Sequence, residues 1–304
     1  MPHDHHHHHV DPDAGDRRVF FAVAINIGLT LLQLIGGLFA GSMALIADAV
    51  HNFSDALSLI LAYGARKLAR RPATEAMPFG HGKIESIAAL INYLTLIVLG
   101  LWLVSAGIDR LANPRDVAGG LVILLALVAL VVDALTAALT FALSKDSANI
   151  RAAFLHNVAD ALGSVAVIIA GLCVLAFGWN WADPLITLVI AGYILWMALG
   201  EIGGVIRSLM LGAPEELDPQ EVIGALQEVP GVADIHNVRL WQMREGVAAF
   251  DAHLALTVDG WADAITVRDY ARHLLHERFG IEHCTLEIEP DGSCPRPALF
   301  GYGV

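Results

Sequence analysis

A seven-residue pattern occurs twice in this chain, and each copy places a histidine and an aspartate four residues apart. The copies run from His51 to Leu57 and from His156 to Leu162, and both read H-N-x-x-D-A-L. Side chains four residues apart on a helix lie on one face, one turn apart. Two such helices facing each other would direct two imidazoles and two carboxylates to one point. That arrangement is a tetrahedral ligand set for a divalent transition metal.

Both copies lie inside long apolar segments, where an ionised aspartate is costly. The chain has 304 residues, is 56% hydrophobic and has a mean hydropathy of +0.60. Several segments exceed the run of about 20 apolar residues that crosses a bilayer. An aspartate at the centre of such a span costs about 2.5–3.5 kcal/mol on insertion scales. Because ionisable residues kept at this cost are usually functional, a metal site is favoured over a packing pair or an intrahelical hydrogen bond.

The charges of the four side chains indicate what they could bind. Two carboxylates and two neutral imidazoles leave two negative charges, which one divalent ion neutralises. Without the ion, the site should take up protons, so metal and protons compete for the same atoms. This competition is the physical basis of an exchanger. Mixed nitrogen and oxygen ligands favour zinc, cobalt or cadmium over magnesium and calcium, which prefer oxygen alone.

Six hydrophobic segments are predicted to span a bilayer. They are expected near residues 19–40, 42–66, 84–107, 118–143, 152–177 and 183–210. Basic residues gather on one side of these spans, at Arg17, Arg18, Arg66, Lys67, Arg70, Arg71, Lys83, Lys145, Arg151 and Arg207. The other side has only Arg110 and Arg115. By the positive-inside rule, both termini are expected in the cytoplasm.

Beyond about residue 214, the pattern changes to that of a small soluble domain. Helices are predicted over 219–229 and 262–279, and strands over 235–243, 248–258 and 281–289. The order α-β-β-α-β is typical of a ferredoxin-like α+β fold. The predicted architecture is therefore an α-helical membrane protein, with six transmembrane helices followed by a cytosolic ferredoxin-like α+β domain. The predicted limits are 1–18 for a disordered His-rich tail, 19–211 for the membrane domain and 212–304 for the cytosolic domain.

The charge and the cysteine content limit the classes of partner and the kinds of cross-link that this chain is expected to have. The formal net charge is −13, and sixteen acids stand against six bases from Glu215 to the end. This acidic balance argues against nucleic acid and anionic lipid as partners of the cytosolic domain. The three cysteines, Cys173, Cys284 and Cys294, give no regular disulfide framework. The N-terminal run His5–His9 is either an expression tag or a native metal-binding tract.

The chain resembles the cation diffusion facilitator family. The paired His-x-x-x-Asp of the second and fifth spans, the stretches Gly41–Asp48 and Phe79–Glu85, and the cytosolic α+β domain carry the resemblance. It implies a homodimeric zinc/proton antiporter that works by alternating access. The transport site implied in this way consists of His51, Asp55, His156 and Asp160. A histidine at the first of these positions goes with zinc-type selectivity in the family.

The resemblance also implies metal ligands on the strands of the cytosolic domain, with zinc bound there and a dimer formed by it. His236, His253 and Glu289 are the best candidates, followed by His283 and Glu287. The alternative is an ordinary solvated face of the sheet, because residues 283, 287 and 289 share one face of the last strand.

Four further residues could take part in metal or proton chemistry. Glu75 and His81 lie between the second and third spans, where some relatives bind metal, but Met77 replaces the additional histidine of those relatives. Asp48 lies one turn before His51, so it could orient His51 or carry protons. Asp133, in the fourth span, could line a cavity or a proton pathway.

The function that these features favour is export of zinc, and of cadmium or cobalt, from the cytosol in exchange for protons. The expected setting is a bacterial plasma membrane, with a lipid bilayer and a second copy of the chain as partners and no nucleic acid. One alternative is a membrane metal sensor or storage protein without flux. A membrane metalloenzyme is disfavoured, because four protein ligands leave no open position for water and no separate general base is present.

Overall fold

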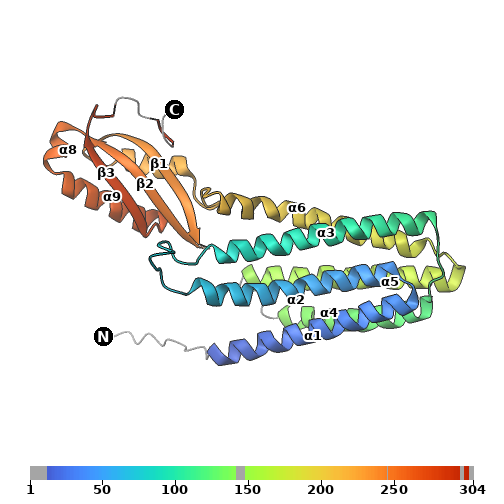
Figure 1. Cartoon of the computed structure of the whole chain (residues 1–304). Coiled ribbons are helices and arrows are strands. Elements are labelled where there is room, and N and C mark those ends of the chain that lie inside the picture. The colour runs from blue at the N-terminus through green and yellow to red at the C-terminus, as the bar shows by residue number, and fades with distance from the viewer. Residues whose placement is uncertain (1–11, 142–147, 245, 295–297, 301–304) are drawn as a thin grey trace. The chain divides into compact units, whose positions relative to one another are not determined.

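The computed structural model describes residues 12–141, 148–244, 246–294 and 298–300, which form helices and one sheet (Figure 1). The chain divides into two compact units. The first consists of Met1–Tyr63 and Ile91–Glu201, and the second of Gly64–Leu90 and Ile202–Val304.

Six long helices correspond to the predicted spans. They are α1 (Pro12–Ala40), α2 (Met43–Ala69), α3 (Ile84–Ala112), α4 (Gly119–Phe141), α5 (Ala148–Phe177) and α6 (Ala182–Leu209). Within the described residues, α2 to α6 contain segments long and apolar enough to cross a membrane, and Ala24–Ala40 of α1 is a shorter apolar helix. The prediction of a helical membrane domain of six helices is confirmed.

The first helix begins earlier than the hydrophobic pattern predicts. Residues 12–18 belong to α1, whereas the sequence predicted them as part of a disordered tail. Proline is well suited to the first position of a helix, where its missing N–H has no intrahelical acceptor to satisfy. The histidine run His5–His9 lies outside the described residues.

Helices α4 and α5 pack closely because glycines meet at their contact. A Cβ atom on Gly119 would lie 2.7 Å from the carbonyl oxygen of Gly171, and one on Gly171 would lie 3.1 Å from that of Gly119. No larger residue fits at such an approach without moving a helix. This contact fixes α5, which carries the second copy of the repeated motif, against α4.

The N-terminus of α2, which carries the first copy, is anchored by an acid on α6. Asp183 is 1% exposed and accepts a hydrogen bond from the backbone N–H of Met43 at 2.8 Å and another from the hydroxyl of Ser42. The first N–H groups of a helix have no intrahelical partner, and a carboxylate there also complements the helix dipole. Gly41 turns the chain with φ +67°, and Arg110 donates a hydrogen bond to its carbonyl. One end of α2 is therefore fixed by buried polar contacts.

The cytosolic part of the second unit is a three-stranded sheet with helices. The sheet contains β1 (Val232–Arg244), β2 (Val247–Leu256) and β3 (His283–Pro290), and the helices are α7 (Pro219–Gln227), α8 (Val258–Ala262) and α9 (Ala264–Phe279). The strand order is β1-β2-β3, with β1 antiparallel and β3 parallel to β2. The core joins sheet residues such as Phe250 and Leu254 to Leu226 of α7 and Leu275 of α9. The predicted α+β domain is confirmed, and the short helix α8 is an addition to it.

A lysine in the same unit joins the loop before α3 to the end of α6. The Lys83 ammonium donates hydrogen bonds to the backbone carbonyl and, at 3.1 Å, to the hydroxyl of Ser208. Partial burial lowers the pKa of Lys83. Ser86 Oγ lies 3.2 Å from Ser208 Oγ, which adds a second polar contact between these segments.

We predict that Asp183→Ala destabilises the membrane domain by about 1–2 kcal/mol, because the Met43 N–H and the Ser42 hydroxyl lose their buried acceptor. The measurement is thermal unfolding of purified protein in detergent. Asp183→Asn should be less harmful, since the amide oxygen still accepts a hydrogen bond. Asp116→Ala is the control, because Asp116 is exposed and accepts a single long hydrogen bond within the described residues, from Asn180 Nδ2 at 3.3 Å. Equal unfolding temperatures for Asp183→Ala and Asp116→Ala would contradict the anchoring role.

Candidate metal centres

The two copies of the repeated motif meet between α2 and α5. His51 Nε2 lies 2.9 Å from Asp160 Oδ1 and 3.9 Å from Asp55 Oδ2. His156 Nε2 lies 3.4 Å from Asp55 Oδ2 and 3.6 Å from Asp160 Oδ2. Each imidazole therefore faces both carboxylates, and each aspartate faces the histidine of the other helix as well as its own. The structure brings together all four side chains singled out by their spacing; we call them the membrane cluster.

The membrane cluster is more buried on one side than on the other. The side chains of His51 and Asp160 are 8% and 9% exposed, whereas Asp55 is 21% and His156 is 40% exposed. Ligand atoms of His51, Asp55 and Asp160 all lie within 4.8 Å of one another. The two most buried members of the cluster, His51 and Asp160, therefore come one from each helix.

An aromatic residue of α6 completes the surroundings of the membrane cluster. The ring of Tyr193 approaches that of His51 edge-on, with ring centroids 6.2 Å apart and ring planes at 75°. Sequence reasoning missed Tyr193, because an aromatic residue in an apolar span gives no signal that separates it from ordinary packing. Nδ1 of His51 is buried and has no hydrogen-bond partner within the described part of the chain.

Asp48 belongs to a buried polar network that joins α2 to α1. Its Oδ2 accepts a hydrogen bond from Gln33 Nε2 at 2.5 Å, and Asn52 Nδ2 donates to Gln33 Oε1 at 2.7 Å. Gln33 is fully buried, and Asp48 and Asn52 are 3% and 6% exposed. Asn52 is the polar residue that follows His51 in the repeated motif, so the network holds the backbone of α2 at the membrane cluster.

Asp133 lies on α4 and is 8% exposed. It accepts a hydrogen bond from Ser164 Oγ of α5 at 3.1 Å. Asp48 and Asp133 are therefore two buried acids outside the ligand set, each held by a neutral polar side chain of a neighbouring helix.

Gln33→Leu is expected to destabilise the membrane domain by about 1–3 kcal/mol, because it leaves the Asp48 carboxylate and the Asn52 amide without their partner. The matched control is Thr30→Val on the same helix. Thr30 is 5% exposed and its hydroxyl has no hydrogen-bond partner among the described residues, so this change should stay within about 0.5 kcal/mol. Denaturation in detergent measures both, and a Gln33→Leu variant as stable as Thr30→Val would refute the network.

A second cluster lies on the cytosolic sheet, with one residue each from β1 and β2 and two from β3. His236 of β1 faces His253 of β2, and their ring centroids are 5.2 Å apart. Glu289 of β3 places Oε1 2.9 Å from His236 Nε2 and Oε2 3.7 Å from His253 Nδ1. Glu287 Oε2 lies 3.2 Å from His253 Nε2. We call His236, His253, Glu287 and Glu289 the cytosolic cluster.

The donor atoms of the cytosolic cluster fit a divalent cation. His236 Nε2 and Glu289 Oε1 are close, yet neither has hydrogen-bond geometry to any described partner, and both are buried. His253 Nδ1 is likewise buried without such a partner. Buried polar atoms are normally paired, so several unpaired atoms converging at one place favour a bound ion. Imidazole nitrogen and carboxylate oxygen are ligands that zinc accepts.

Three other predicted ligands are not brought into a cluster. His283 is exposed and pairs with Ala249, four residues before His253 along β2. Glu75 is exposed. His81 is partly buried and its Nδ1 has no hydrogen-bond partner in the described ranges. None of the three belongs to a metal-ligand group among the described residues.

Fold and site together define a multi-pass membrane protein with a candidate cation site inside its helices and another on a soluble α+β domain. Two family descriptions match this chain. Cation efflux transmembrane domain covers residues 19–210, and Cation efflux protein, cytoplasmic domain covers residues 214–291. The chain therefore belongs to the cation efflux family, as its resemblance to cation diffusion facilitators indicated. It is a cation efflux transporter with a cytoplasmic C-terminal domain, and not an enzyme.

Curated relatives are similar over almost their whole length. The "Cadmium, cobalt and zinc/H(+)-K(+) antiporter" of Bacillus subtilis (strain 168) is 32% identical over 288 residues, covering 93% of this chain and 92% of the relative. "Zinc transporter ZitB" of Shigella flexneri is 33% identical over 301 residues, covering 98% and 95%. "Zinc transporter ZitB" of Escherichia coli (strain K12) is 33% identical over 293 residues, covering 95% and 93%.

Proposed function

We propose that this protein exports zinc from the cytosol in exchange for protons, with the membrane cluster as its transport site. The observation that carries this proposal is the geometry of the cluster. Nε2 of each imidazole lies 2.9–3.9 Å from a carboxylate oxygen of each of the two aspartates. The names of the relatives support it, since they include zinc transporters and a cadmium, cobalt and zinc antiporter that uses protons.

The ligand chemistry supports zinc, cadmium and cobalt as cargo. Two imidazoles and two carboxylates supply four donors, the number that zinc prefers. These mixed donors suit zinc and cobalt better than magnesium or calcium. Both imidazoles supply nitrogen ligands. His51 is the more buried of the two and the closer to Asp160, so we expect it to be the more important nitrogen ligand.

Proton exchange follows from the charge of the same atoms. When no metal is bound, the imidazoles and carboxylates share protons across their short contacts. Zinc needs all four side chains deprotonated, so its binding releases protons. Asp48 and Asp133 are placed to accept or orient such protons, since each is buried on a helix that carries or packs against the motif. Alternating access of α2 and α5 then releases the ion on the other side of the membrane.

The cytosolic cluster is the proposed resident zinc site. His236, His253 and Glu289 would hold the ion, and Glu287 supplies the next nearest carboxylate. Zinc there would neutralise buried carboxylate charge on the cytosolic sheet, within a domain that we propose to form the homodimer. The membrane domain is assigned to residues 19–211 and the cytosolic domain to 212–304. The bacterial relatives and the basic residues of the loops support a bacterial plasma membrane with both termini inside.

The cytosolic cluster also supports a second candidate function, a membrane metal sensor without flux. A sensor would bind zinc through the cytosolic cluster alone and would not depend on the membrane cluster.

Asp160→Ala is predicted to abolish zinc accumulation in inverted vesicles or proteoliposomes, while the variant remains folded. The reason is that Asp160 contacts both imidazoles of the membrane cluster. In the wild type, dissipating the pH gradient should stop accumulation. Asp109→Ala is the matched control, because its carboxylate is 56% exposed and lies outside the cluster. Wild-type flux from correctly inserted Asp160→Ala protein would exclude this transport site, and zinc binding without flux in the wild type would favour the sensor.

A further inference from the structure

The outer edge of β1 is covered by two other parts of the chain. Such an edge presents N–H and C=O groups that need partners. Toward the end of β1, the N–H of Gln242 donates to the carbonyl of Gly212 at 3.1 Å. In the middle of the strand, the N–H groups of Asn237 and Val238 donate to the carbonyls of Ala298 and Leu299 at 2.8 and 2.9 Å. We call residues 298–300 the C-terminal strap.

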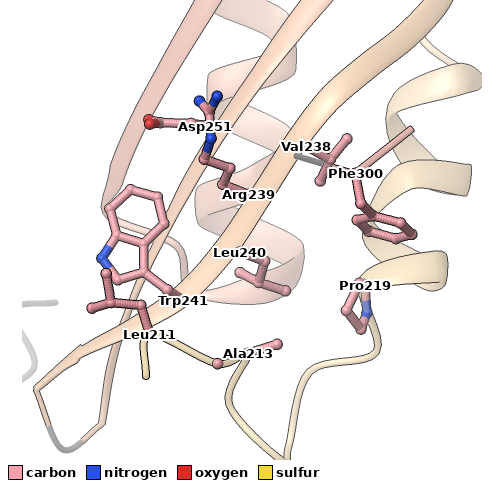
Figure 2. A pocket seen from close by; sticks show the side chains of 10 residues that line it. Leu211, Ala213, Pro219, Val238, Arg239, Leu240, Trp241, Asp251 and Phe300 are labelled. Atoms are coloured by element: carbon pink, nitrogen blue, oxygen red, sulfur yellow. The ribbon is translucent and has the colours of Figure 1, made fainter. Parts of the chain in front are cut away.

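One aromatic side chain of the strap, Phe300, forms part of the lining of a cavity of about 450 Å³ and is 50% exposed. Figure 2 shows Phe300 beside Val238, Leu240 and Pro219, with Arg239 and Asp251 at another part of the lining. The lining is mainly apolar and consists of Leu211, Gly212, Ala213, Pro219, Val238, Arg239, Leu240, Trp241, Asp251 and Phe300. Leu299, the neighbour of Phe300, does not line it. The strap therefore has one side chain that lies along this cavity and one that does not.

The strap pairs with β1 at an irregular position next to the cytosolic cluster. The register between β1 and β2 shifts between His236 and Arg239, which marks a bulge. Asn237 has φ +53°, in the left-handed region that asparagine tolerates better than most residues. Its side-chain nitrogen lies 3.5 Å from His253 Nε2. The two residues bonded to the strap thus directly follow His236, and one of them reaches His253.

We propose that the C-terminal strap is a positioning element for metal binding by the cytosolic cluster. The strap holds the bulge at Asn237 and Val238, and the bulge directs His236, which is 3% exposed, toward Glu289. This inference rests on the proposed metal site of the cytosolic cluster. If strap docking raises the affinity for zinc, zinc binding raises the stability of the docked strap by the same factor, because the coupling is reciprocal.

The test uses full-length protein in detergent with His51→Ala, Asp160→Ala and alanine in place of His5–His9 as the background, so that neither the membrane cluster nor the N-terminal histidine run contributes to zinc binding. Zinc affinity is measured by competition with a chromogenic chelator. Ending the chain at Pro297 or changing Phe300→Ala should weaken zinc binding roughly tenfold, the size of effect seen when a group supporting a metal ligand is lost. Phe300→Leu should restore most of the affinity, because leucine keeps a large apolar side chain along the cavity wall. Leu299→Ala is the matched control and should change affinity by less than about twofold, since its carbonyl bond to β1 is kept.

A second readout separates positioning from general stabilisation. Zinc should slow hydrogen exchange at the Asn237 and Val238 amides in the background protein and should fail to do so in His236→Ala. If removal of the strap left zinc affinity unchanged while His236→Ala still lost binding, the positioning role of the strap would be wrong and the proposed cytosolic site would stand. Equal zinc binding in the background protein and in His236→Ala would overturn both proposals.

Discussion

Two negative charges enclosed by apolar helices are the constraint on which the membrane domain depends. Each buried aspartate costs about 2.5–3.5 kcal/mol to insert, and His51 and Asp160 are among the most buried ionisable residues of the bundle. A bound divalent ion or shared protons offset this cost. Under the proposed function, the membrane cluster would change its occupant by replacing one positive species with another, which is what coupled exchange requires.

The surrounding structure keeps the two halves of the membrane cluster in register. Asp183 fixes one end of α2, the Gln33 network holds α2 beside the cluster, and the glycine contact of α4 and α5 fixes the helix opposite. The cytosolic cluster follows the same physical rule on a sheet, where cross-strand pairing brings His236, His253 and Glu289 together. In both places, residues outside the cluster hold the side chains that we propose as ligands.

Local periodicity explains what could be predicted from the sequence. A four-residue spacing on a helix and a two-residue alternation on a strand are properties of short segments, so the spans, the motif pairs and the cytosolic α+β domain could be predicted. Contacts between residues far apart in the sequence could not be predicted in this way. Asp183 and Ser42 are 141 residues apart, and nothing near either indicates the other. The same reason explains why Tyr193, the bulge at Asn237 and the strap were missed. His283 was predicted as a ligand because the alternation of faces along a strand does not tell which residues of the neighbouring strand lie beside it.

Calorimetry of zinc binding tests the central claim most directly. Titrations of a His236→Ala, Glu289→Ala protein that also has alanine in place of His5–His9, in buffers of different ionisation enthalpy, give the number of protons released per zinc ion bound at the membrane cluster. The proposed exchange predicts net proton release and an affinity that weakens from about pH 8 to about pH 6, as imidazole protons compete with the metal. Zinc binding of constant affinity across that range, with no proton release, would contradict it.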